Sequence, residues 1–425
     1  MGIDAGTSGI RACCIDGQAN LLAETNLPLP PTEVQGNQVS QAPQVWASVL
    51  DELLQQLGKK ISFQNLKAIA IDGTSGTVFF TDEQGQPTSK ALMYNDARSL
   101  EQVKQLQSLT DNTVVQSVAA GLPKLMWLHQ HRSTDARYAV HQADWLGFLL
   151  TDKIGHSDIN NCLKTGYDPF KKKWPEWLDQ IPEIQETLPE VHPPGSPISP
   201  VSKRAASEYG FPATTQLVAG TTDSHAAILA TGVQNIGEGI TSLGSTLVVK
   251  VISDVPVFDK HYGIYSQPFG PPSNQLWLVG GGSNSGGAVL RQLFTDDVMQ
   301  SLSEKIDPQQ DSGLDYYPLN KPGERFPIND PELAPRMTPR PKDDAQFFQG
   351  LLEGIARIEH QAYKRLAELG APYPVSIRTV GGGAKNKTWT KIRKRYCQTE
   401  IIQCEYTEAA YGSALLAMQA YQNTH

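Results

Sequence analysis

Apolar residues recur every three or four positions in two long segments of the chain. Between Trp46 and Leu57 they stand at i, i+3, i+4, i+7, i+8 and i+11, which is one stripe of an amphipathic helix. The segment from Leu351 to Leu369 has the same kind of spacing. Gly58 and Gly370 follow these stripes, and glycine is typical of the end of a helix. Both segments are therefore predicted to be helices that pack on a sheet.

Short apolar runs that border Gly, Ser and Thr predict strands joined by tight turns. The run from Ile10 to Ile15 follows the turn 4–9 and is predicted to form a hairpin with the residues before it. The runs 66–71 and 77–80 flank the polar segment 72–76. They are predicted to be a second hairpin with a second polar tip.

The strand, small-residue turn and strand of the N-terminus recur as 239–243, Gly244-Ser245 and 246–252. The other predicted elements are strands at 216–219 and 375–380 and helices at 224–230 and 409–420. The repeat predicts two domains of one architecture, each presenting a Gly/Ser/Thr hairpin to a shared cleft. The alternation of strands and helices predicts α/β domains with mixed sheets.

Proline interrupts this pattern in two places. The segment 191–200, VHPPGSPISP, is predicted to run as an extended surface loop before a helix, because proline cannot donate to a strand ladder. Residues 318–341 contain seven prolines and are predicted to form an irregular excursion.

The length and charge of the chain exclude some classes of protein. A chain of 425 residues predicts two or three domains. It has 44 acidic and 36 basic side chains, and the basic run 391–395, KIRKR, is short and is predicted to be a solvated helix face. This balance lacks the positive footprint of a nucleic-acid-binding surface.

No apolar stretch reaches the ~20 residues that span a bilayer, so we expect no membrane partner. The N-terminus resembles neither a secretory signal nor a transit peptide, and we expect a cytoplasmic location. The five cysteines have spacings that match neither a zinc site nor a redox motif, which predicts reduced thiols.

The turn Asp4-Ala5-Gly6-Thr7-Ser8-Gly9 has the composition of a phosphate-handling loop. Glycines let backbone N–H groups approach an anion, hydroxyls donate to it, and a carboxylate can hold a divalent cation. A tight hairpin whose Asp and Ser satisfy turn amides is the structural alternative. Two more such turns, 244–246 and 381–384, favour phosphate binding, and neither a P-loop nor a dinucleotide fingerprint is present.

On these motifs the chain resembles the FGGY carbohydrate kinase family of the actin-like ATPase superfamily, nearly from end to end. Residues 4–8 resemble its first phosphate motif, 243–246 its second, and 381–386 with Trp389 its adenosine motif. Residues 323–327 match the GER-x-P stretch.

Two further matches complete the six motifs, which occur in the correct order. Residues 94–98 resemble the W-x-D-x-R stretch, with Tyr94 where the family usually has Trp. Residues 220–227 match the G-x-x-D-x-x-A-A segment that holds the catalytic base. Only three residues precede Asp4, which implies a short first strand or a natural start upstream of Met1.

The resemblance implies two ribonuclease-H-like domains with mixed sheets, flanking helices and a central cleft. The N-terminal domain would span 1–228 and be joined by the C-terminal helix of about 405–425. The C-terminal domain would span 229–404. The chain is compact for the family, which implies fewer insertions around the substrate.

The resemblance also assigns roles to individual residues. Asp223 would be the catalytic base and contact the sugar, although an Asp there could simply cap the following helix. Asp4 would hold Mg²⁺ through water and lie near the sugar. The other residues expected to bind ATP or its phosphates are Thr7, Ser8, Gly244, Ser245, Thr246, Gly382, Gly383, Asn386 and Trp389.

Within the adenosine motif, the two glycines would admit the nucleotide, Asn386 would bond the base, and Trp389 would wall the pocket or belong to the core. The sugar hydroxyls would meet Asp72, Thr74, Ser75 and Asp96, for which turn-satisfying roles are the alternative. His225 is interpreted as structural.

The implied activity is ATP-dependent phosphorylation of a pentulose, D-ribulose to D-ribulose 5-phosphate, by a monomer or homodimer that requires Mg²⁺. The chain looks closest to the short xylulokinase-like D-ribulose kinases of cyanobacteria and plants. A xylulokinase, a catalytically silent sugar sensor and an actin-like chaperone or filament ATPase are the alternatives. Asp223 argues against the sensor, and no peptide-binding β-domain follows to favour the chaperone.

Overall fold

The computed structural model describes residues 1–131, 135–270 and 276–424, and these divide into two compact units. The first unit contains Met1–Ala230 and the C-terminal segment from Tyr406. The second contains Thr231–Gly270 and the segment that ends at Glu405. The predicted boundaries, after residues 228 and 404, lie beside these divisions.

The first unit is built on a mixed sheet with the strand order β12-β13-β6-β1-β2-β3, and β14 also pairs with β6. These strands are β1 (Gly2–Ala5), β2 (Gly9–Ile15), β3 (Leu21–Pro28), β6 (Ala68–Gly73), β12 (Pro197–Pro200), β13 (Gln216–Val218) and β14 (Thr221–Thr222). Strands β1 and β2 form the predicted antiparallel hairpin, whereas β1 and β6 are parallel. Because side chains alternate along a strand, Ile3 and Ile71 enter one core, and Asp4 and Asp72 face the other side.

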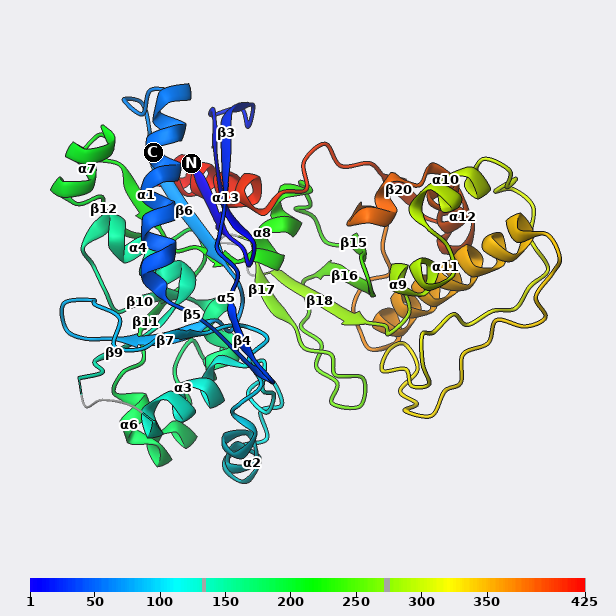
Figure 1. The fold of residues 1–425 in the computed structure, drawn as a ribbon, viewed down its shortest axis with the longest axis horizontal. Helices are drawn as coiled ribbons and strands as arrows, with labels where there is room; N and C mark the ends of the chain where they lie inside the picture. The colour runs from blue at the N-terminus through cyan, green and yellow to red at the C-terminus, as the bar shows by residue number, and fades with distance from the viewer. Residues whose placement is uncertain (132–134, 271–275, 425) are drawn as a thin grey trace. The chain divides into compact units, whose positions relative to one another are not determined.

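Helices cover both faces of this sheet (Figure 1). The face of Ile3 packs against α1 (Pro43–Lys60) and α4 (Gln142–Thr151). The opposite face packs against α13 (Ala409–Thr424), which also lies along α8 (Asp223–Ala230). In Figure 1 the red α13 lies beside the blue strands of the N-terminus, so the first and last elements of the chain share one unit.

A smaller antiparallel sheet of the first unit has the order β4-β5-β8-β7-β9. Its strands are β4 (Glu33–Gln35), β5 (Gln38–Gln41), β7 (Val78–Thr81), β8 (Ala91–Leu92) and β9 (Tyr138–His141), and the helices near it are α2 (Leu100–Leu109) and α3 (Gly121–Gln130). The predicted hairpin of 66–71 with 77–80 is therefore wrong, since β6 and β7 lie in different sheets. Both edges of β6 are already paired, to β1 on one side and to β13 and β14 on the other, which leaves no edge for β7.

The remaining elements of the first unit are short. They are β10 (His156–Asp158), α5 (Ile159–Cys162), the 3₁₀ turns Leu163–Thr165 and Glu176–Gln180, α6 (Pro182–Gln185), β11 (Glu190–His192) and α7 (Lys203–Tyr209). The proline-rich segment 191–200 is thus not wholly loop. It contributes to β11 and forms β12, which lies at a sheet edge, where a missing N–H donor is tolerated.

The first predicted helix also runs further than expected. Gly58 lies within α1, which continues to Lys60. A Cβ at Gly58 would come 3.2 Å from the ring of Phe63, so the glycine makes room for that ring and does not end the helix.

The second unit repeats the topology of the first, as the sequence predicts. Its sheet has the order β17-β18-β16-β15-β19-β20, in which β15 is antiparallel to β16 and parallel to β19. The strands are β15 (Glu238–Leu243), β16 (Leu247–Ser253), β17 (Gln267–Phe269), β18 (Leu276–Gly282), β19 (Ser376–Val380) and β20 (Glu400–Ile402). The helices are α9 (Gly287–Leu293), α10 (Asp296–Ser303), α11 (Asp344–Glu368), α12 (Lys387–Cys397) and the 3₁₀ turn Gly382–Lys385. Residues 318–341 contain neither helix nor extended strand, as predicted.

A buried ion pair joins α11 to α12. The guanidinium of Arg393 contacts both carboxylate oxygens of Glu359 at 2.6 Å and donates to Thr379 at 2.8 Å. The run 391–395 is therefore only partly a solvated face. Helical periodicity places Ile392 and Arg393 in the core and leaves Lys391 and Lys394 exposed.

In the described part of the chain, no helix has the length and apolar content needed to cross a membrane. All five cysteines are free thiols, and four of them are buried.

The crossing of α8 and α13 depends on a glycine. A Cβ at Gly412 would lie 1.7 Å from the carbonyl oxygen of Ala226, so the helices could not keep this spacing. We expect Gly412→Ala to lower the stability of the first unit by about 1–3 kcal/mol, despite the higher helix propensity of alanine. Differential scanning calorimetry measures the effect. Gly17→Ala, where no atom lies within 4 Å, is the matched control, and equal melting temperatures for the two variants would contradict the prediction.

Candidate functional site

Two carboxyl groups face each other beneath the first Gly/Thr/Ser turn. The parallel pairing of β1 and β6 places Asp4 directly opposite Asp72. Arg11 donates to Asp4 Oδ2 at 3.0 Å, and Ser413 of α13 donates to Asp72 Oδ2 at 2.5 Å. Asp4 is almost completely buried and Asp72 is completely buried.

Burial raises the pKa of both carboxyl groups, and different neighbouring charges then act on each of them. The pKa of Asp72 is well above its ordinary value, because burial and the negative charge of Asp4 both disfavour its ionised form. Burial also raises the pKa of Asp4, and Arg11 opposes that increase. The pKa of Asp72 is therefore the more strongly raised of the two, and Asp72 is the member of the pair that keeps a proton more readily.

The acidic cluster fits a divalent cation. Asp72 lies opposite Asp4, and the charge of Asp223 also acts on Asp72, so carboxyl groups gather in this part of the first unit. Carboxylate oxygens suit Mg²⁺, and Asp4, directly beneath the first turn, is the carboxylate that would hold it.

The structure places Asp72 away from the expected hairpin tip. Asp72 lies inside β6, and its side chain faces Asp4 and Ser413. It is completely buried in the described structure.

Thr7 and Ser8 stand at the exposed tip of the turn between β1 and β2. Gly6 N–H donates to the carbonyl of Gly9 at 3.0 Å, and the carbonyl of Ser8 accepts from Leu29. These backbone bonds fix the turn and leave the two hydroxyls at its surface.

Asp223 begins α8, and its position depends on Gly220. A Cβ at Gly220 would lie 1.8 Å from the carbonyl oxygen of Ile71, so only glycine lets the chain pass between β13 and β14 at this distance from β6. Asp223 is half-buried, and its Oδ1 accepts from the N–H of Ser224 at 2.6 Å. The carboxylate therefore contributes to the start of the helix while part of it stays exposed.

Lys164 is a neighbour of Asp223 that the sequence analysis missed. Burial lowers the pKa of Lys164, and the charge of Asp223 opposes this decrease. The ammonium group lies 3.5 Å from the carbonyl oxygen of Ser75, which is itself half-buried. The sequence gives no sign of these contacts, because Lys164 lies in a 3₁₀ turn that is distant in sequence from both Asp223 and Ser75.

A second lysine fixes the loop that carries Ser75. The buried ammonium of Lys124 donates to the carbonyl oxygens of Gly76, Met93 and Tyr94 at 2.8, 2.7 and 3.0 Å. It ties the 74–77 turn to the segment with Tyr94, and it too was not predicted.

Two further residues expected at the sugar are fully engaged by the protein. The hydroxyl of Thr74 contacts Gln142 Oε1 and the hydroxyl of Thr77. Asp96 is completely buried, accepts from the N–H of Val39 at 2.6 Å and pairs with Arg98 at 2.8 Å. Both side chains are buried in these contacts, and of the four predicted sugar contacts Ser75 is the one that lies partly exposed.

A ladder of side-chain amides supports the strand before Asp223. Asp158 accepts from the N–H groups of Asn160 and Asn161 at the start of α5. The two asparagine side chains then donate to the hydroxyl and carbonyl of Thr221 at 2.9 and 3.2 Å. Through Thr221, these hydrogen bonds hold β14 just before α8 begins.

In the second unit, Gly244, Ser245 and Thr246 form the turn between β15 and β16, and both hydroxyl residues are exposed. Arg291 of α9 donates to the hydroxyl of Ser245 at 3.1 Å. The turn therefore combines hydroxyl donors with a guanidinium, which suits an anion.

The glycine turn after β19 differs in detail from its prediction. A Cβ at Gly383 would meet Leu243 and Trp389 at 2.7 and 2.8 Å, so this glycine serves packing within the unit. Gly382 is exposed, and no atom lies within 4 Å of a Cβ built there. Gly382 thus remains open to a ligand.

The two other residues of the adenosine motif are structural in this geometry. Trp389 is buried in the core, where its ring N–H donates to the carbonyl of Leu352, so it does not wall a pocket. The side chain of Asn386 caps α12 through the N–H of Trp389 and donates to Ser303 at 2.8 Å. His225 is buried, in agreement with its structural interpretation.

Comparison with known proteins matches both units to one family. The N-terminal domain of the FGGY family of carbohydrate kinases matches residues 1–230, and its C-terminal domain matches residues 239–421. A xylulose kinase of Staphylococcus epidermidis is 23% identical over 98% of this chain and 87% of its own length. A gluconokinase of Bacillus subtilis is 20% identical over 99% of this chain and 87% of its own.

Solved structures show the same fold. The ligand-bound xylulose kinase from Lactobacillus acidophilus has a TM-score of 0.84 and 19% identity, and covers 99% of this chain and 89% of its own. Plasmodium falciparum glycerol kinase with ADP has a TM-score of 0.86 and 19% identity over the same shares of the two chains. These similarities establish a two-domain α/β fold with mixed sheets.

The raised pKa of Asp72 predicts a pH-dependent stability. Its pKa is higher in the folded than in the unfolded chain, so the stabilising contribution is complete below about pH 4 and declines as the pH rises through the folded value. We expect Asp72→Asn, which imitates the protonated group, to gain stability relative to wild type as the pH rises from 4 to 7.

Thermal unfolding of both proteins across this range measures the difference. Asp297→Asn, at an exposed position of α10, is the matched control and should follow the wild type. A difference between Asp72→Asn and wild type that stays constant with pH would contradict the assignment of the proton.

Proposed function

The chain belongs to the FGGY family of carbohydrate kinases, and we propose that it transfers the γ-phosphoryl group of ATP to a pentulose to form the 5-phosphate and ADP. It is an enzyme of the sugar kinase class. Sugar kinases of this family use ATP and generally require Mg²⁺.

The observation that carries the proposal is the position of Asp223. Its carboxylate starts α8 with part of its surface exposed, and Gly220 and the amide ladder to Thr221 hold the preceding strand. An ordinary aspartate is ionised at neutral pH and can accept a proton. We assign it the role of general base.

The reaction needs little more than positioning and charge neutralisation, because phosphoryl transfer passes through a loose transition state. The sugar oxygen bonds to the γ-phosphorus, the bond from that phosphorus to the bridging oxygen of ADP breaks, and the hydroxyl proton passes to Asp223. The exposed hydroxyls of Thr7 and Ser8 would donate to phosphate oxygens. Asp4 would hold Mg²⁺, which supplies charge neutralisation to the phosphates when bound.

In the second unit we assign phosphate binding to the turn Gly244-Ser245-Thr246. Its two hydroxyl residues are exposed, and Arg291 adds a cation beside Ser245. Gly382 is the member of the adenosine motif whose surroundings leave space for the nucleotide. Asn386 and Trp389 would contribute indirectly, by holding α12 behind that turn.

The sugar itself is a separate part of the proposal. The sequence predicts D-ribulose, and the relatives include proteins named xylulose kinase, so D-xylulose is the competing substrate. The two sugars are epimers at C3. Ser75, near Lys164 and partly exposed, is the residue to which we assign recognition of the C3 hydroxyl.

Replacement of Asp223 tests the catalytic role. We expect Asp223→Asn to remove sugar-dependent ADP release, since an amide cannot accept the proton, while MgATP binding measured by calorimetry persists. Asp296→Asn changes an exposed aspartate in the first turn of another helix, α10, and should keep wild-type turnover. Turnover of Asp223→Asn within a few-fold of wild type would exclude Asp223 as the base.

A coupled ADP-release assay with both pentuloses tests the choice of sugar. We expect a higher kcat/KM for D-ribulose, by roughly 5- to 150-fold, because the wrong epimer leaves a site group unpaired at about 1–3 kcal/mol. Ser75→Ala should reduce this ratio toward one, and Ser108→Ala, an exposed serine of α2, should preserve it. A kcat/KM ratio that favours D-xylulose would identify D-xylulose, and not D-ribulose, as the preferred substrate. A ratio that Ser75→Ala leaves unchanged would exclude Ser75 from recognition of the sugar.

A further inference from the structure

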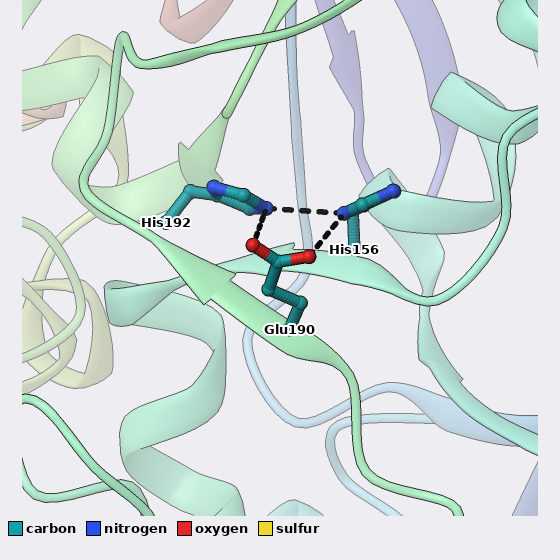
Figure 2. A group of neighbouring side chains, drawn as sticks. All are labelled: His156, Glu190 and His192. Atoms are coloured by element: carbon teal, nitrogen blue, oxygen red, sulfur yellow. Dashed lines mark hydrogen bonds and ion pairs between the residues drawn. The ribbon is translucent and has the colours of Figure 1, made fainter.

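Two histidines and a glutamate converge on one face of the short parallel ladder of β10 and β11. Strand pairing puts His156 of β10 directly opposite Glu190 of β11. His192 follows Glu190 by two positions, so its side chain points to the same face. Figure 2 shows the two imidazole rings and the carboxylate pointing toward one another from neighbouring strands.

The three side chains come close enough together to share one metal ion. His156 Nδ1 lies 3.1 Å from His192 Nε2 and 3.6 Å from Glu190 Oε2, and His192 Nε2 lies 3.8 Å from Glu190 Oε1. With one ligand atom from each residue, all three atoms lie within 4.8 Å of one another. Ligands held about 2.0–2.1 Å from a tetrahedral ion are separated by ~3.3–3.4 Å, so the exposed glutamate would turn to bring a single oxygen to both nitrogens.

The exposure of the three side chains leaves the cluster open to a cation. The side chains of His156 and His192 are 28% and 19% exposed, whereas that of Glu190 is 70% exposed. The ligands therefore combine two partly buried imidazoles with an exposed carboxylate at the surface, where an ion can enter.

From this geometry we propose that His156, Glu190 and His192 bind a divalent transition-metal ion, with Zn²⁺ as the representative ion. Imidazole nitrogens select borderline ions of this class over Mg²⁺ and Ca²⁺, which prefer oxygen ligands. Three protein ligands leave a fourth position for water. Among the residues that the structure describes, this is the group whose histidine and carboxylate donor atoms come close enough together to hold such an ion.

The site would link two segments that are distant in sequence. His156 and His192 are 36 positions apart, and β10 leads directly into Asp158 and α5. A bound ion would hold β10 against β11 more firmly than the surface ion pairs of Glu190 do, since exposed pairs of this kind contribute little. Because the ion binds the folded ladder and not the separated strands, it stabilises the fold in proportion to its occupancy.

Metal uptake by the full, tag-free chain tests the proposal. The protein is stripped with EDTA, dialysed into excess Mg²⁺ to occupy oxygen-ligand sites, and titrated with ZnCl₂ in a calorimeter without nucleotide. We expect one equivalent of Zn²⁺ to bind and to raise the melting temperature. His156→Gln and His192→Gln should each lose this uptake, and Glu190→Gln should weaken it.

His129→Gln, an exposed histidine of α3, is the matched control and should bind as wild type. Melting temperatures in EDTA identify any variant that fails to fold, and the exposed Glu190→Gln then decides the test. The visible spectrum of the Co²⁺-loaded chain gives a second reading, in which nitrogen and oxygen ligation lacks the thiolate charge-transfer band of a cysteine site. No uptake by wild type, uptake unchanged in all three variants, or a thiolate band would each overturn the proposal.

Discussion

The close approach of two buried carboxyl groups is the constraint on which the first unit depends. Parallel pairing of β1 with β6 places Asp4 and Asp72 together where water is excluded, which raises the pKa of both groups. The guanidinium of Arg11 opposes the increase at Asp4. Asp72 instead accepts the hydrogen bond of Ser413, through which α13 packs against the sheet.

The two units share one topology, but opposite charges lie near their Gly/Ser/Thr turns. If the turns are aligned at Gly6 and Gly244, Asp4 corresponds to Ser242, and the second unit brings a guanidinium, Arg291, to its turn. Its buried charges include the pair of Glu359 with Arg393 between α11 and α12. One turn therefore has a carboxylate behind it, and the other has a cation beside it.

Much of this arrangement follows from local sequence, and the rest does not. The hairpins of β1 with β2 and of β15 with β16, the amphipathic helices and the internal repeat were predictable because each depends on neighbouring residues, and the order of six motifs pointed to the family. The predicted hairpin of 66–71 with 77–80 failed, because the partners of β6 come from distant parts of the chain. The partners of Asp72, Thr74 and Asp96 were not, because Ser413, Gln142 and Val39 reach them from distant elements. A polar residue beside a glycine turn has the same sequence pattern whether it is exposed or buried. Lys164 was missed for the same reason, since only tertiary structure brings it near Asp223.

The place of α13 in the first unit has a consequence for synthesis on the ribosome. Ser413 meets Asp72 across 341 positions, so one face of the first sheet stays uncovered while the whole second unit is translated. The second unit, whose segments lie between residues 231 and 405, has all its strands available before α13 emerges. The unit that begins first is consequently the one completed last, and its apolar face must be kept from aggregation until the final helix arrives.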